Sequence, residues 1–143
     1  MFKRIVGILI MFIFMVSLLA CKQDIKADKL TTDVINNTKF NEKDIAKAID
    51  IVKNNFDFKG CTLKKVWYDE EKSRYITKGY LGSGKGSINN VNPENIIVLL
   101  SDFEVDSLGG DGSFEPNSTY GEWQWILIRD SKTSEWRIDS WGY

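Results

Sequence analysis

Tyr120-Gly121-Glu122-Trp123-Gln124-Trp125-Ile126-Leu127-Ile128-Arg129 and Glu135-Trp136-Arg137-Ile138-Asp139-Ser140-Trp141-Gly142-Tyr143 are two runs rich in aromatic and β-branched residues. A polar segment, 130–134, separates them. Strand-forming runs on either side of a short polar turn predict a β-hairpin. A register symmetric about Lys132 would pair residues of matching bulk or charge, which stabilises neighbouring strands. Its pairs are Arg129 with Glu135, Ile128 with Trp136, Ile126 with Ile138, and Trp123 with Trp141.

In this register the two faces of the hairpin differ. The first face is apolar and consists of Ile126, Ile128, Trp136 and Ile138. The second face mixes large apolar and charged side chains: Trp123, Trp125, Leu127, Trp141, Arg129, Glu135, Arg137 and Asp139. We expect the first face to lie on the core. The second face is either available to a partner or covered by a loop.

Composition excludes several classes of function. The 143 residues are 13% aromatic and 27% charged, which is typical of one folded domain. Removing a leader that contains Lys3 and Arg4 leaves 17 basic against 20 acidic residues, so a role in binding nucleic acid is not expected. Histidine is absent, which excludes Ser-His-Asp and Cys-His nucleophiles and His-ligated zinc. The sequence predicts no cofactor and no resident metal.

The amino terminus has the pattern of a secretory signal. Two basic residues precede an apolar run over 5–19, which is shorter than the roughly 20 residues that cross a bilayer. Leu18 and Ala20 stand three residues and one residue before Cys21, and this pattern resembles the lipobox of bacterial lipoproteins. The resemblance implies cleavage before Cys21 and acylation of its thiol, and two acyl chains make a stable anchor. The alternative is an uncleaved amino-terminal anchor, and both interpretations place the folded part outside the cytoplasm.

The chain therefore divides into three parts: a signal peptide over 1–20, a lipidated cysteine with a polar tether over 21–39, and a single domain over 40–143. In the domain, a helix is expected first, over 41–55, because Asn41 is a good N-cap and Ile45, Ala48, Ile49 and Val52 form an apolar stripe. Strands are expected over 62–68, 74–81 and 96–103, with a turn at 69–72 and loops over 82–95 and 106–118.

The order of these elements predicts an α+β fold: an N-terminal helix packed on a curved, mainly antiparallel and cone-like sheet of about five strands. The strand over 96–103 is apolar on both faces, which favours the middle of a sheet covered on both sides.

Two segments resemble ligand-binding motifs, but each lacks a residue that its motif requires. The segment 79–86 nearly matches a phosphate-binding P-loop, but Gly86 stands where that motif needs Ser or Thr, and we reject a nucleotide site. Acidic residues over 102–111 could bind calcium, yet Ser107 stands where an EF-hand loop needs Gly. A solvated acidic loop is the favoured interpretation, and a looser cation site stays open.

The residues singled out for binding a ligand or partner are Trp123, Trp125, Trp141, Tyr120 and Asp102. An open aromatic face is typical of a site for a protein, a glycan or a small molecule, and the alternative is that most of these rings belong to the core. Asp102 follows a buried strand. It is therefore also the candidate acid or base of a small enzyme, with Tyr120 or Tyr68 as its hydrogen-bonding partner.

Several segments together resemble a family of small uncharacterised bacterial lipoproteins, over about 41–143: Cys61-Thr-Leu, Trp67-Tyr-Asp-Glu, Ile97-Val-Leu-Leu-Ser-Asp-Phe, the run 120–129 and the run 136–143. That family is similar to the nuclear-transport-factor-2-like (cystatin-like) fold, in which a bent sheet wraps around helices and often leaves a pocket. The resemblance implies no catalytic residues.

We therefore expect a membrane-anchored extracytoplasmic lipoprotein, held at the outer face of the bacterial membrane through Cys21, with a non-catalytic ligand- or protein-binding domain. Its expected partners are the lipid bilayer and an envelope protein or small ligand. The alternative is a small pocket enzyme of the hydratase or isomerase type that uses Asp102 with a tyrosine.

Overall fold

The computed structural model describes residues 30–143, so the predicted signal peptide and Cys21 lie outside the described residues. The elements in chain order are β1 (Thr31–Ile35), α2 (Glu42–Asn55), β2 (Cys61–Asp69), α3 (Glu70–Ser83), α4 (Gly86–Asn89), the 3-10 turn η1 (Pro93–Asn95), β3 (Ile96–Val105), β4 (Thr119–Ile128) and β5 (Arg137–Gly142). None of the helices over 30–143 is long and apolar enough to cross a membrane.

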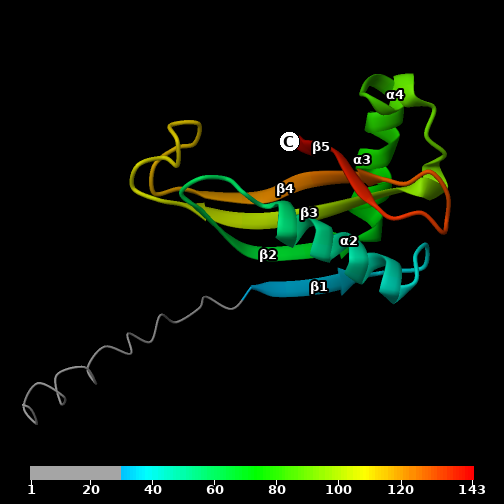
Figure 1. The fold of residues 1–143 in the computed structure, drawn as a ribbon, viewed down its shortest axis with the longest axis horizontal. Helices are drawn as coiled ribbons and strands as arrows, with labels where there is room; N and C mark the ends of the chain where they lie inside the picture. Colours follow the sequence, from blue (N-terminus) through cyan, green and yellow to red (C-terminus); the bar gives the residue numbers. More distant parts are fainter. Residues whose placement is uncertain (1–29) are drawn as a thin grey trace, which may run out of the picture.

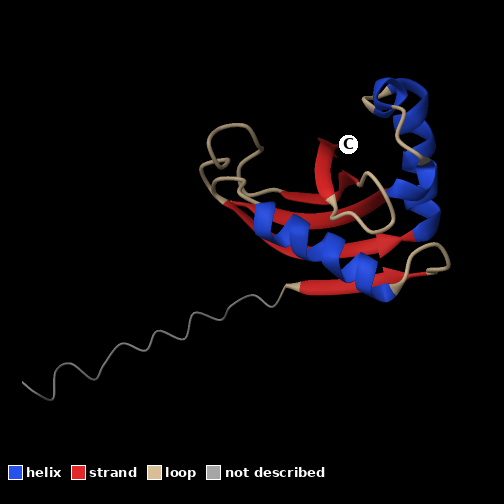
Figure 2. Cartoon of the chain, turned by 45° about the vertical axis from the view of Figure 1, so that its right-hand side comes forward, coloured by secondary structure: helices blue, strands red, loops and turns tan. Residues whose placement is uncertain are grey.

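Within the described residues, five strands form one sheet in the order β1-β2-β3-β4-β5. β1 is parallel to β2, and the other three neighbouring pairs are antiparallel. Figure 1 shows α2 lying along the front of the sheet and α3 standing upright at one end of it. The protein is therefore an α+β fold with a mixed sheet, whose elements are coloured by type in Figure 2.

Strand β1 changes the expected start of the domain. Thr31–Ile35 falls inside the predicted tether, yet it pairs with residues 65–69 of β2. The prediction that a helix is the first ordered element is therefore wrong. β1 is an edge strand with mostly exposed side chains, so backbone pairing rather than apolar burial holds it in place. A search for apolar periodicity does not detect such a strand.

Helix α2 has the start and the apolar stripe that its sequence indicates. The Asn41 side chain accepts a hydrogen bond from the backbone N–H of Asp44 at 2.8 Å, which satisfies a free donor of the first turn. Four residues of the helix are buried: Ile45, Ala48, Ile49 and Val52. They pack in one cluster with strand residues that include Ile97, Leu99, Trp125 and Leu127. This cluster is the core on the first face of the sheet.

Helix α3 replaces a predicted turn and a predicted strand, so both of those predictions are wrong. Asp69 ends β2 and caps α3, because its carboxylate accepts hydrogen bonds from the backbone N–H groups of Glu71 and Lys72. The helix buries Ser73, Thr77 and Tyr80, which are spaced as one helical stripe. Ser73 and Thr77 are small polar residues, and for this reason the apolar pattern does not reveal the stripe.

The second face of the sheet is covered by α3. The Tyr80 ring packs on Ile96, Val98, Ile126 and Ile128. The Ser73 hydroxyl oxygen accepts a hydrogen bond from the backbone N–H of Val98 at 3.1 Å, just beyond the point where β2 stops pairing with β3. Strand β3 is thus buried between two helices, as its two apolar faces predict.

The predicted hairpin is present as β4 and β5, but in a different register. The observed pairs are Ile128 with Arg137, Leu127 with Ile138, Ile126 with Ser140, and Trp125 with Trp141. The register shifts between Ile126 and Leu127, so Asp139 is an extra residue in β5 that forms a bulge. The predicted face of Ile126, Ile128, Trp136 and Ile138 is wrong: Trp136 and Ile138 pack with Trp125 and Leu127 beneath α2, while Ile126 and Ile128 pack beneath α3.

Candidate functional site

The predicted binding residues are divided between the core and the surface. Trp125 is buried, and its indole N–H donates to the Ser101 hydroxyl at 2.8 Å. Trp123 and Tyr120 are half-buried and belong to a cluster of rings. The other rings that contact them include Phe58, Phe103 and Phe114. These aromatic residues build one end of the fold and leave little open surface there.

Two rings at the carboxyl end keep large exposed surfaces. Trp141 is 58% exposed and stacks on Trp125, with 6.4 Å between ring centroids. Tyr143 is 73% exposed and meets Trp123 edge-on at 5.1 Å. Each ring covers a more buried ring with one side and presents the other to solvent. The predicted aromatic face is thereby reduced to two separate exposed rings.

Asp102 lies in β3 and contacts the backbone of β4. Its carboxylate accepts a hydrogen bond from the backbone N–H of Glu122 at 3.0 Å. Glu122 has a φ of 56°, which is unfavourable for a residue with a side chain, and it lies at a register shift between β3 and β4. No tyrosine hydroxyl over 30–143 bonds to the Asp102 carboxylate. The same residues contain no group of three or more His, Cys, Asp or Glu side chains that could hold a metal ion.

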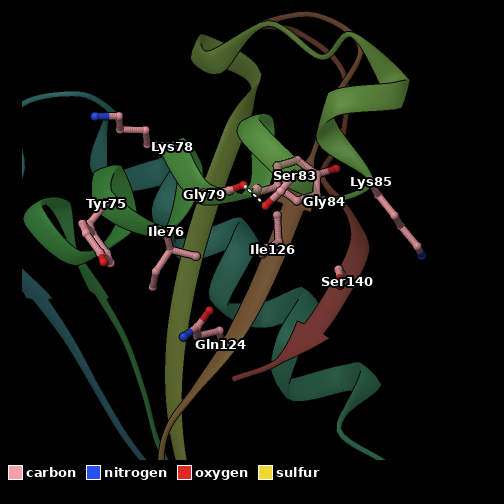
Figure 3. A pocket seen from close by; sticks show the side chains of 11 residues that line it. Tyr75, Ile76, Lys78, Gly79, Ser83, Gly84, Lys85, Gln124, Ile126 and Ser140 are labelled. Carbon is pink, nitrogen blue, oxygen red and sulfur yellow. Dashed lines mark hydrogen bonds between the residues drawn. The ribbon is translucent and has the colours of Figure 1, made fainter.

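A groove lies between α3 and the strands β4 and β5. Its volume is about 630 Å³, which is in the range of small-molecule sites. Figure 3 shows Tyr75 and Ile76 on α3 across from Gln124 and Ile126 on β4, with Ser140 on β5. This cavity lies on the face of the sheet for which the sequence predicts no helix.

The strand side of the groove carries two polar groups without partners. Neither the Gln124 amide nor the Ser140 hydroxyl makes a hydrogen bond with the described part of the chain. Ser140 reaches the groove because the bulge at Asp139 places it opposite Ile126. Apolar walls with a small number of hydrogen-bonding groups are typical of sites that bind small molecules.

Gly79 keeps the groove open on its helix side. A Cβ atom added at Gly79 would meet no atom within 4 Å. Glycine inside a helix costs about 1 kcal/mol relative to alanine, and here no close packing requires it. Gly82, on the same helix, is equally unobstructed but does not line the groove. The two glycines therefore provide a matched pair for experiments.

Tyr80 lines one end of the groove and is bonded to Asp139 in β5. The Tyr80 hydroxyl donates to the Asp139 carboxylate at 2.7 Å, and the Lys85 ammonium donates to the Asp139 carbonyl at 2.9 Å. Burial, and next the bond to Asp139, raises the pKa of Tyr80 to about 12. Gly86 lies against the same ring, since a Cβ there would be 2.4 Å from a ring carbon. The ring is therefore held in one position.

A second hollow of about 530 Å³ adjoins the other end. Tyr75, Ile76 and Gln124 line both hollows, so the groove continues along α3 towards its amino terminus. There the Lys72 ammonium donates a hydrogen bond to the Glu122 carboxylate, which joins α3 to β4. This bond raises the pKa of Lys72. Hydrogen bonds thus join both ends of α3 to the sheet, and the middle of the helix borders the groove.

Residues 22–142 match a family described as a domain of unknown function, DUF4829. The chain belongs to this family. No curated protein and no solved structure matches the chain. The matched range contains every helix and strand described above, so the groove lies within the part of this chain that matches DUF4829.

The groove was not expected from the sequence, because its helix wall includes residues 74–81, which were predicted to form a strand. One signal for the helix was present: Asp69 is followed directly by Glu70 and Glu71, which is the pattern of an N-cap with acidic residues in the first turn. The position of Ser140 in the groove could not be predicted either. The side of the sheet on which Ser140 lies depends on a bulge that residue types do not reveal.

The groove is lined by several hydroxyl groups. Ser83 and Ser140 both line it: the Ser83 hydroxyl donates to the Gly79 carbonyl, and the Ser140 hydroxyl makes no hydrogen bond within residues 30–143. The raised pKa of Tyr80 keeps its phenol neutral at ordinary pH, where it acts as a hydrogen-bond donor to Asp139. On its strand side the groove offers the apolar surface of Ile126, the Gln124 amide and the Ser140 hydroxyl.

Proposed function

We propose that this protein is a lipid-anchored binding protein at the outer face of the bacterial cell membrane. It would bind a small amphipathic ligand, without catalysis, in the groove beside α3. The basic start, the apolar run and the lipobox resemblance before Cys21 support the anchor. The free amide of Gln124 and the free hydroxyl of Ser140 in the groove support a binding role.

The observation that carries this proposal is the empty space at Gly79, next to the free polar groups of Gln124 and Ser140. Ile76 and Ile126 would cover an apolar part of the ligand, which gains about 25 cal/mol for each Å² removed from water. The amide and the hydroxyl would bond to a polar group of the same molecule and fix its orientation.

The position of the groove suits a ligand that approaches from outside the membrane. Nine residues, 22–30, separate Cys21 from β1, and they reach at most about 30 Å when fully extended. β1 begins at one end of the sheet and α3 stands at the other end (Figure 1). A domain held by this short segment would present the α3 end away from the lipid surface.

We also propose that the domain is distantly related to the nuclear-transport-factor-2-like fold. Support comes from an α+β sheet that leaves a hollow between one face and a helix, which is the arrangement that this fold uses for its pockets. A solved structure of a DUF4829 domain with an unrelated connection of strands and helices would remove this part of the proposal.

Plugging the groove tests the binding site. The full chain in lipid nanodiscs would be titrated with the fluorescent probe 1-anilinonaphthalene-8-sulfonate, with empty nanodiscs subtracted. Gly79→Phe places a ring in the groove and should weaken binding about tenfold, a loss of ~1.4 kcal/mol. Gly82→Phe makes the same change on the same helix outside the groove, and should bind as the wild type does. Equal affinities for the two variants would exclude the groove as the site.

Replacing the predicted acylation site tests the anchor. Cys21→Ala removes the thiol to which the lipid would be attached, so the variant should shift from the membrane fraction to the soluble fraction. Cys61→Ala removes the other cysteine of the chain and is the control that should stay in the membrane fraction. Lipid anchoring is wrong if Cys21→Ala remains in the membrane fraction in the amount seen for the wild type.

A further inference from the structure

The polar groups on the floor of the groove have a fixed arrangement. Gln124 in β4 faces Gly142 in β5, and Ile126 faces Ser140. Gln124 and Ser140 are therefore diagonal neighbours on one face of the sheet, with α-carbons roughly 7–8 Å apart. Ile126 is next to both of them, and Gly142 has no side chain that would cover the Gln124 amide. The floor thus offers two hydrogen-bonding groups beside one apolar side chain.

Both of these polar groups are uncharged, and both can donate as well as accept hydrogen bonds. The Gln124 amide has two N–H donors and a carbonyl acceptor, and the Ser140 hydroxyl is a donor and an acceptor. Neither group is bonded within the described residues. Hydroxyl groups of a ligand also donate and accept, so they complement both. An alkyl chain would cover the two groups without pairing them, which costs free energy.

Charged side chains do not enter this part of the groove. Lys78 and Lys85 are the charged residues among those that line it, and Figure 3 shows both side chains leading away from it. The Lys85 ammonium is already bonded to the Asp139 carbonyl, at 2.9 Å. No carboxylate of residues 30–143 lines this part of the groove. A charged group of a ligand would therefore find no opposite charge beside Gln124 and Ser140, and this favours an uncharged ligand.

The floor of the groove is the face of a sheet rather than its edge. β4 lies between β3 and β5, and its residues 124–128 pair with both neighbours. The backbone groups of this part of β4 are thus already paired, so an extended peptide cannot add to it as a further strand. Side chains alone bond to a ligand here. This favours a compact molecule that carries several hydrogen-bonding groups of its own.

We propose that the ligand of the groove is an uncharged sugar. A pyranose ring has a face of C–H groups and a rim of hydroxyls, which match the apolar and the hydrogen-bonding parts of the floor. The hydroxyls would bond to Gln124 and Ser140, and the C–H face would lie on Ile126. This inference rests on the proposed function, because it names the ligand class of the same groove.

The ring of Tyr75 gives the site room for a second sugar unit. Tyr75 is 81% exposed and lines both hollows together with Gln124. Figure 3 shows Tyr75 and Ser140 on opposite sides of Gln124. A flat aromatic ring covers the C–H face of a sugar without taking up its hydroxyls. A disaccharide would thus place one unit over Ile126 and the next against Tyr75.

Neutral disaccharides test this ligand class. Cellobiose, maltose, lactose and N,N′-diacetylchitobiose would each be titrated on the full chain in lipid nanodiscs by ligand-observed NMR, with empty nanodiscs subtracted. At least one of them should bind, and its affinity should be equal at low and high salt, because no charged contact is made. 1-Hexanol, which has an alkyl chain and a single hydroxyl, should bind more weakly than that sugar.

Substitutions on the floor and the wall assign the contacts. Gln124→Leu and Ser140→Ala each delete one free hydrogen-bonding group and should weaken sugar binding about three- to tenfold. Ser83→Ala removes a groove hydroxyl that is already bonded to the Gly79 carbonyl, and is the control that should bind as the wild type does. Tyr75→Ala should weaken binding of the disaccharide and leave that of its monosaccharide unchanged. Urea unfolding checks that each variant is folded.

The outcomes separate this inference from the proposed function. Gly79→Phe should abolish sugar binding, whereas Gly82→Phe should preserve it. If the naphthalene probe depends on Gly79 while no sugar binds, or while hexanol binds more tightly than every sugar, the sugar is the wrong ligand and the groove remains a binding site. Sugar affinities unchanged in both Gln124→Leu and Ser140→Ala also overturn the inference. If neither the probe nor the sugars respond to Gly79→Phe, both proposals fail.

Discussion

The Tyr80 hydroxyl donates a hydrogen bond to the Asp139 carboxylate across 2.7 Å, and this bond joins the last full turn of α3 to the bulge in β5. The Tyr80 ring lies on the apolar surface of Ile126 and Ile128, so the phenol has a buried body and a polar tip at the groove. Asp139 reaches it because an extra residue in β5 points towards α3. The bond therefore sets the position of the helix over the strands.

Removing this hydroxyl should destabilise the fold. Tyr80→Phe keeps the ring and deletes a bond to a charged group, which costs about 1.5–3 kcal/mol in free energy of unfolding. Tyr75→Phe removes a hydroxyl from the same helix at a residue that is 81% exposed, and should change the free energy by less than about 0.5 kcal/mol. Urea unfolding followed by tryptophan fluorescence measures both. Similar losses in the two variants would contradict a specific role for the Tyr80–Asp139 bond.

The same bond gives the protein a dependence on alkaline pH. The pKa of Tyr80 is raised from 10.0 to about 12, chiefly by burial and then by Asp139. A group whose pKa is higher in the folded state stabilises that state fully below its unfolded pKa and loses the effect as pH rises through its folded pKa. The free energy of unfolding should therefore fall between pH 10 and about 12, measured by urea unfolding at each pH.

A comparison of variants identifies the group responsible for that fall. Tyr80→Phe should show a shallower fall over the same pH interval, because its ring has no proton to lose. Some dependence should remain, since burial also raises the pKa of Tyr68 to about 12. A Tyr80→Phe curve as steep as that of the wild type would assign the alkaline transition to other groups.

The hairpin shows what residue types determine and what they leave open. Aromatic and β-branched runs around a polar turn were enough to predict both strands. They were not enough to predict the register, because one extra residue at Asp139 shifts every pair and reverses which side chains share a face. Arg129 was expected opposite Glu135, yet it pairs with Asp44, while Glu135 pairs with Lys47.

About five strands were expected and five are present in the described residues, but one predicted strand is a helix and one observed strand was not predicted. The segment 74–81 is helical although it carries aromatic and β-branched residues, because the Asp69 cap and the packing of Ser73, Thr77 and Tyr80 override local preference. β1 supplies the missing strand from a polar segment. The candidate groove depends on both facts and on the bulge, so it could not be predicted from apolar periodicity.

Two glycines near α3 should respond to alanine in opposite directions. Gly79→Ala meets no atom within 4 Å and should stabilise the fold by about 0.5–1 kcal/mol through helix propensity. Gly86→Ala would place Cβ 2.4 Å from the Tyr80 ring, and should destabilise by about 1–3 kcal/mol because the ring must leave its place beside Asp139. Thermal unfolding of the two variants measures the difference, and a shift of the same sign in both would contradict this account of the groove.

The contact between Arg129 and Asp44 ties α2 to the end of β4 and gives the last prediction. Arg129 is only 5% exposed, its guanidinium is 3.3 Å from the Asp44 carboxylate, and it lies 4.2 Å from the centroid of the Trp136 ring. Asp44→Ala leaves this buried cation without its carboxylate and should cost about 3 kcal/mol in free energy of unfolding. Asp50→Ala removes the exposed partner of Lys53 on the same helix and should cost less than about 1 kcal/mol. Urea unfolding distinguishes the two, and equal losses would mean that Arg129 does not need Asp44 to stay buried.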